Sequence, residues 1–254
     1  MLLSVSVILA QPRAKLYRAN VHIRHVETRV TRLQQSVKGH VKIHPQFHTE
    51  RLEYTVEHVA FDDLALLIGD AIHNMRCALD YTWLETIERL VPQSVSNHAK
   101  FPIYKLIEEV KGELRKGNVH TTCPALFDFT VDEIKPFERG NYPIWAVHSF
   151  DNRDKHRLLL PVLAQGHIEG LEVQDRDGNI TPGFGVSGFQ RPPYVIDLVK
   201  GLHFASKGKL TAHVGVEDSK SGCFLGIPDS LKEYERVIFR VVELFENFLK
   251  AQGF

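Results

Sequence analysis

The chain has 254 residues, of which 43% are hydrophobic and 24% charged, and its formal net charge is zero with the histidines neutral. That length allows one large domain, or two small ones, with a well-filled core. Equal numbers of basic and acidic residues argue against a broad nucleic-acid-binding surface, but they are compatible with a small local basic site. No apolar run approaches the roughly 20 residues of a membrane-spanning helix, so no membrane contact is expected.

The cysteine pattern bears on the compartment. Cys77, Cys123 and Cys223 lie far apart, and the chain has no Cys-x-x-Cys pair. This spacing favours reduced thiols over a disulfide framework or a structural zinc site, and predicts a cytoplasmic protein. Residues 1–12 start with a short apolar run that lacks a basic flank, and they are predicted to be a peripheral leader or a short strand; a secretory signal is the alternative.

Apolar residues recur at helical spacing through much of the first two thirds of the chain. The spacing predicts helices over residues 13–36, 61–90, 103–116, 124–135 and 143–163. A β-hairpin is expected within residues 38–59, because apolar and polar residues alternate from Leu52 to His58.

The pattern changes over residues 164–227, where glycine is frequent and residues 195–204 and 210–216 alternate as strands do. Asp177-Gly178-Asn179 predicts a hairpin turn. A last amphipathic helix is expected over residues 228–252. Together these elements predict one α+β domain over residues 13–254: a helical bundle of N-terminal, two central and C-terminal helices, with a small antiparallel β insertion and the N-terminal hairpin.

Two polar clusters stand out within helical segments, where ionisable groups cost free energy unless they are paired, exposed or useful. On a helical projection of the first cluster, Gly69–Asp80, the polar side chains share the face opposite the apolar one, and Arg76 can pair with Asp80 one turn later. The second cluster, Asp151–Arg157, concentrates basic groups, and His148, Asn152, Lys155 and His156 share one side. A solvated helix surface would explain either cluster alone.

If the two clusters meet, they supply an acid–base site. His73 and His156 would divide the base and acid roles, with Asp70 or Asp80 orienting a histidine and Lys155 serving as a further catalytic group. Substrate would be held by Asn74, Arg76, Asp80, Asn152 and Arg157. No cofactor is expected. A metal site built from Asp70, His73, His148 and His156 is the weaker interpretation, because these residues form no recognised metal-binding motif.

The segments Ile68–Tyr81, Phe101–Ile103, Ile134–Phe137 and Asp151–Arg157 together resemble, in this order, a family of uncharacterised bacterial proteins. That resemblance supplies no activity. A looser resemblance is to the HEPN superfamily of helical proteins, many of which are metal-independent RNases. It depends on Arg153 and His156, whose spacing is shorter than the one typical of that superfamily.

Two functions follow as expectations. The first is a nucleic-acid- or nucleotide-directed enzyme of the metal-independent RNase type, with RNA or another phosphate-bearing molecule as its ligand. The second is a non-catalytic binding or structural protein, which allows a homodimer, in which both clusters are buried polar networks.

Overall fold

Helices and antiparallel strands make up the protein, which belongs to the α+β class as the sequence predicts. The computed structural model describes residues 8–36, 38–43, 49–55, 61–94, 100–157, 162–188, 194–218 and 223–254, although the side chains of residues 154–157 and of several strand residues lie outside this description. None of the helices in these ranges combines the length and the apolar character that a membrane crossing requires. The chain forms two compact units.

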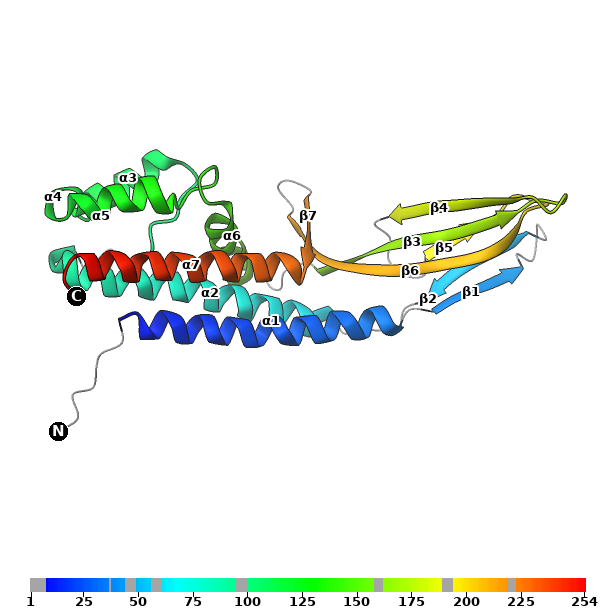
Figure 1. The fold of residues 1–254 in the computed structure, drawn as a ribbon, viewed down its shortest axis with the longest axis horizontal. Helices are drawn as coiled ribbons and strands as arrows, with labels where there is room; N and C mark the ends of the chain where they lie inside the picture. The colour runs from blue at the N-terminus through cyan, green and yellow to red at the C-terminus, as the bar shows by residue number, and fades with distance from the viewer. Residues whose placement is uncertain are drawn as a thin grey trace, which may run out of the picture. The chain divides into compact units, whose positions relative to one another are not determined.

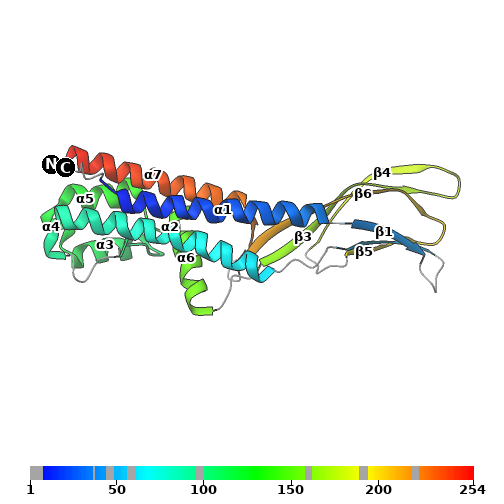
Figure 2. The ribbon, with the colours of Figure 1, turned by 90° about the horizontal axis from the view of Figure 1, so that it is seen from below.

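Unit 1 comprises residues 1–24, 66–160 and 229–254, and it is helical. The helices to which it contributes are α1 (Ala10–Ser36), α2 (Phe61–Leu90), η1 (Pro92–Ser94), α3 (Ile107–Lys116), α4 (Val119–Thr122), α5 (Pro124–Asp128), the π-helical η2 (Phe129–Ile134), α6 (Tyr142–Arg157) and α7 (Asp229–Ala251). Figures 1 and 2 show α1, α2 and α7 running side by side. The N- and C-terminal helices therefore share a bundle, as expected.

The core of unit 1 is aromatic where α2 and α7 meet. The Phe101 ring lies edge-on to Trp83 of α2 and to Phe245 of α7, at centroid distances of 5.8 and 5.7 Å. Phe129 adds a further edge contact to Phe245 at 5.0 Å. Such edge contacts between aromatic rings stabilise the fold by more than the burial of the rings alone.

Unit 2 comprises residues 25–65 and 161–228 and contains the strands. They form a three-stranded sheet in the order β1-β2-β5 and a four-stranded sheet in the order β4-β3-β6-β7, all antiparallel where paired. Their bounds are β1 Lys38–Ile43, β2 Glu50–Thr55, β3 Val162–Gln174, β4 Ile180–Gly188, β5 Tyr194–Asp197, β6 His203–Asp218 and β7 Cys223–Ile227. The core of this unit contains Leu52, Tyr54, Ile168, Leu171 and Leu210.

Several predicted boundaries need correction. The helix predicted over residues 143–163 ends at Arg157, and residues 162 and 163 belong to β3, paired with β6; Pro161 lacks the backbone donor that a continuing helix needs. The strand predicted over 195–204 is two strands, because Gly201 has a φ of +94° in the turn between β5 and β6.

Other differences lie at the ends of helices. Helix α1 starts at Ala10 and Leu9 is fully buried, while residues 1–7 lie outside the described part of the chain. Helix α3 starts at Ile107 and not at residue 103, because Tyr104 forms a β-bridge with Phe137. The β-hairpin, the turn at Asp177-Gly178-Asn179 and the long α2 are confirmed.

Candidate functional site

Helix α2 has the two faces that its sequence predicts. The apolar face is fully buried, and it comprises Leu64, Ile68, Ala71, Ile72, Met75, Leu79 and Trp83. On the other face, Asp70 and His73 are exposed, while Cys77 and Asp80 are half-buried. The chemistry of this face therefore depends on which neighbours it meets within unit 1.

The two polar clusters meet through His73 and Asp151. His73 Nδ1 lies 2.9 Å from Asp151 Oδ1, which joins α2 to α6. The His73 side chain is 46% exposed and the Asp151 side chain only 3%. An ionised carboxylate only accepts hydrogen bonds, so Nδ1 carries the hydrogen toward Asp151, and in the neutral imidazole Nε2 then has the lone pair. The pair thus holds the His73 ring in one orientation, with nearly half of its side chain open to solvent.

The other nitrogen of His73 faces a thiol. Cys77 Sγ lies 3.4 Å from His73 Nε2, one turn further along α2. The thiol is half-buried and is not in a disulfide. Cys77, His73 and Asp151 therefore form a continuous line of thiol, imidazole and carboxylate.

Arg76 and Asp80 hold the backbone of Phe101. Arg76 Nη2 lies 2.9 Å from Asp80 Oδ1 and donates to the Phe101 carbonyl at 3.2 Å. The Phe101 N–H donates in turn to Asp80 Oδ1 at 2.8 Å. Both groups predicted to bind substrate thus fix a core aromatic residue, and their substrate role stays a prediction.

Burial shifts the pKa of both members of this pair. It lowers the pKa of the Arg76 guanidinium, a shift that Asp80 and Asp151 oppose. It raises the pKa of the Asp80 carboxyl, a shift that Arg76 and the Phe101 N–H oppose. The Arg76 side chain is 5% exposed, and its Nη1 has no hydrogen-bond partner among the described residues. The pair is therefore held in a medium that penalises charge.

Asp70 and Asn74 take other partners. Asp70 Oδ2 lies 3.8 Å from Nδ1 of the buried His22 on α1, whereas the carboxylate that contacts His73 is Asp151. The Asn74 amide donates to the Asp70 carbonyl at 2.8 Å, one turn back along α2.

Helix α6 brings together part of the second cluster. The Asn152 amide donates to His148 Nε2 at 3.0 Å, so these two residues share a face as expected. Lys155, His156 and Arg157 are on the same helix, but their side chains lie outside the described residues, so their catalytic and binding roles stay predictions.

Asp151 and Cys77 are the two members of this site that were not predicted as functional residues. The sequence places Asp151 at helical spacing after the apolar residues Ile144 and Val147, so it falls on the apolar side of α6. All three residues are buried. A carboxylate on the apolar stripe of a helix needs a partner. Cys77 could have been found from its position one turn after His73 on the same face.

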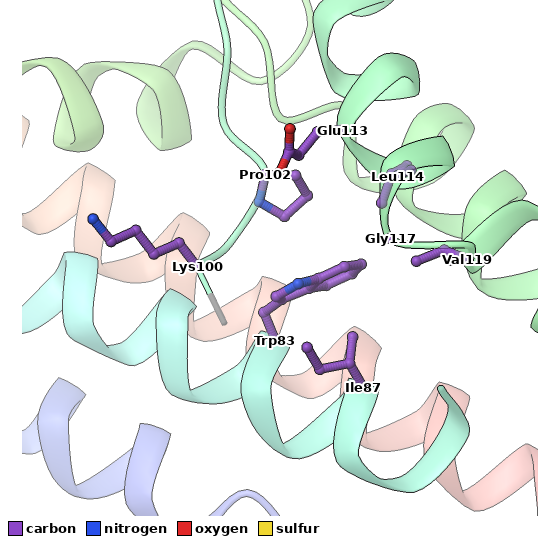
Figure 3. A pocket seen from close by; sticks show the side chains of 8 residues that line it. All are labelled: Trp83, Ile87, Lys100, Pro102, Glu113, Leu114, Gly117 and Val119. Carbon is purple, nitrogen blue, oxygen red and sulfur yellow. The ribbon is translucent and has the colours of Figure 1, made fainter. Parts of the chain in front are cut away.

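A separate shallow hollow, open to solvent, lies between α2 and the α3–α4 segment (Figure 3). Trp83 forms one side, with Leu114 and Val119 opposite, and Lys100 directs its amino group away from the ring. His73, Cys77 and Asp151 are not among the residues that line it.

Among the described side chains, no three His, Cys, Asp or Glu residues gather as a metal site would require. Comparison of the chain with known protein families, with curated proteins and with solved structures finds no match.

Proposed function

We propose that the face shared by α2 and α6 is a metal-independent acid–base site that cleaves RNA. The observation that supports the proposal is the His73–Asp151 pair: a half-exposed imidazole oriented by a buried carboxylate. This is the arrangement of a general base, which must be reachable by substrate and yet fixed in its tautomer.

In this proposal His73 Nε2 takes the proton from a ribose 2′-hydroxyl, whose oxygen attacks the adjacent phosphorus. The 5′-oxygen leaves with a proton from the acid, a role assigned to His156, and a cyclic phosphate remains. The thiol of Cys77 is a weak donor, so a substrate hydroxyl can displace it from Nε2. The loose resemblance of the segment around Arg153 and His156 to HEPN-type RNases favours RNA as the substrate class.

Charge on the neighbouring helix favours a phosphate-bearing ligand. Between Ala10 and Arg24, α1 has four basic residues and no acidic one, although the whole chain is neutral. Lys15 Nζ lies 5.9 Å from the centre of the Tyr81 ring, and His22 approaches Asp70, so these two residues of α1 lie beside the polar face of α2, whereas Arg13 pairs with Glu246 of α7. Clustered cations are the usual means of holding a phosphate backbone.

The test is cleavage of a labelled single-stranded RNA by the purified chain in EDTA. We expect His73→Ala and Asp151→Asn each to lower the rate by about 10²- to 10⁴-fold, the usual contribution of a general base and its orienting group. His156→Ala is expected to abolish cleavage. His120→Ala is the matched control, since His120 is an exposed histidine of α4 in the same unit. Wild-type cleavage by His73→Ala, or no cleavage by the wild type, would overturn the proposal.

The second candidate is a non-catalytic structural or binding protein. Arg76 and Asp80 favour this structural role, because they bind both backbone groups of Phe101. Such a polar network fixes the packing of a core residue and needs no substrate. On this alternative the wild type leaves RNA intact, and Asp151→Asn lowers the denaturant midpoint instead. Light scattering of the purified chain tests the homodimer that this alternative allows.

A further inference from the structure

We infer that Cys77 is a nucleophilic thiol, activated by His73 and Asp151, that accepts acyl groups from activated esters. The inference uses the same His73–Asp151 pair as the proposed function, but it does not depend on RNA being a substrate.

The geometry is that of a nucleophile, a base and a carboxylate that orients the base. Sγ of Cys77 lies 3.4 Å from Nε2 of His73, whose Nδ1 lies 2.9 Å from Oδ1 of Asp151. With Asp151 accepting from Nδ1–H, the free lone pair on Nε2 is directed to the thiol. The three-group line, and not the cysteine alone, is what identifies activated nucleophiles across unrelated folds.

A second observation is independent of these hydrogen bonds. The buried guanidinium of Arg76 interacts electrostatically with Cys77 and with Asp151. Its Nη1 has no hydrogen-bond partner among the described residues. A buried cation with an unused donor favours negative charge nearby, and a sulfur that loses its proton supplies that charge.

The substrate class follows from the single imidazole. His73 takes the thiol proton as Sγ bonds to a carbonyl carbon, and it gives that proton to the leaving oxygen when the ester bond breaks. The product is a thioester on Cys77 and a free alcohol. Water, with His73 again as base, then releases the carboxylic acid and restores the thiol. Acyl transfer is the chemistry in which one base takes and returns the same proton.

The experiment treats the full chain with p-nitrophenyl acetate at neutral pH and maps the acetylated cysteines by mass spectrometry. Cys123 is the internal control, because it is also half-buried and not in a disulfide, and it has no such pair with histidine among the described contacts. We expect Cys77 to be acetylated at least about tenfold faster than Cys123, and His73→Gln to slow acetylation of Cys77 by about 10²-fold. Cys77→Ala removes this acetylation, and Cys123→Ser leaves it unchanged.

Equal acetylation rates for Cys77 and Cys123 in the wild type would refute the inference, and this comparison requires no variant to fold. So would an unchanged Cys77 rate in a folded His73→Gln protein. Neither result depends on RNA cleavage, so failure of the thiol chemistry and failure of the proposed RNase are observed separately.

Discussion

At the scale of single residues, the pair of Arg76 and Asp80 sets a buried guanidinium against a half-buried carboxylate. We expect Arg76→Ala to lower the free energy of unfolding by about 1–3 kcal/mol at neutral pH, because the half-buried Asp80 carboxylate then lacks its charged partner. Urea denaturation measures this loss. The control is Lys111→Ala, which removes an exposed ion pair with Glu108 and should cost under about 1 kcal/mol.

The pH dependence of this loss follows from the raised pKa of Asp80. A carboxyl with a raised pKa in the folded state is destabilising when ionised, so its cost is absent at low pH and grows as pH rises through the ordinary range of aspartate. Removing Arg76 raises that pKa further. Arg76→Ala should therefore lose less stability near about pH 4 than near about pH 7, and an equal loss at both would contradict this account.

Residue-scale prediction from sequence worked where partners lie on one helix. The Arg76–Asp80 pair and the His148–Asn152 pair are one turn apart and could be predicted from spacing alone. The contact between His73 and Asp151 joins residues 78 positions apart. Helical periodicity does not specify which helices meet, so the true partner of His73 could not be identified from the pattern.

At the scale of elements, Glu246 ties α7 to α1. It accepts hydrogen bonds from Arg13 of α1 and, at 2.7 Å, from Lys250 of α7. The bond from Arg13 is the largest cause of a lowered pKa for Glu246, and the bond from Lys250 is the next. A carboxyl with a lowered pKa stabilises the folded state above its ordinary pKa, and that stabilisation is lost as pH falls through the folded value.

Glu246→Gln should accordingly flatten the fall in stability between about pH 5 and about pH 3, by under about 1 kcal/mol because the pair is only partly buried. Urea midpoints measured across this range provide the test. Glu243→Gln is the matched control, since Glu243 pairs with Arg240 of its own helix. A slope equal to that of wild type in Glu246→Gln would count against the tie.

Long amphipathic elements were the most predictable ones. Helices α2 and α7 start and end within a residue or so of their expected positions, because each has an apolar stripe over several turns. Strand β3 lies mostly within the predicted β insertion and directly before the predicted hairpin turn, but its bounds were not predicted and its first residues were assigned to a helix. The apolar residues Val162 and Leu163 fit a buried strand and a buried helix equally well by pattern, and their pairing with β6, which the pattern does not reveal, makes them part of a strand.

At the scale of the whole molecule, each of the two compact units has its own core. One is the aromatic cluster around Phe245, and the other is the apolar cluster that includes Leu210. If residues 13–254 form one domain, as the sequence predicts, these two cores unfold together; if they form two, each core unfolds separately. Native-state hydrogen exchange measures this directly, since it reports opening free energies segment by segment.

Phe245→Ala should cost about 3–5 kcal/mol and Leu210→Ala about 2–5 kcal/mol, as deletions from packed cores do. If the cores open separately, Phe245→Ala accelerates exchange in α2 and α7 and leaves β3 and β6 unchanged, and Leu210→Ala does the reverse. We expect this pattern, because the two sets of core residues are distinct. Helices α1 and α2 each supply residues to both units, so acceleration of every protected amide by either variant would instead show one cooperative domain.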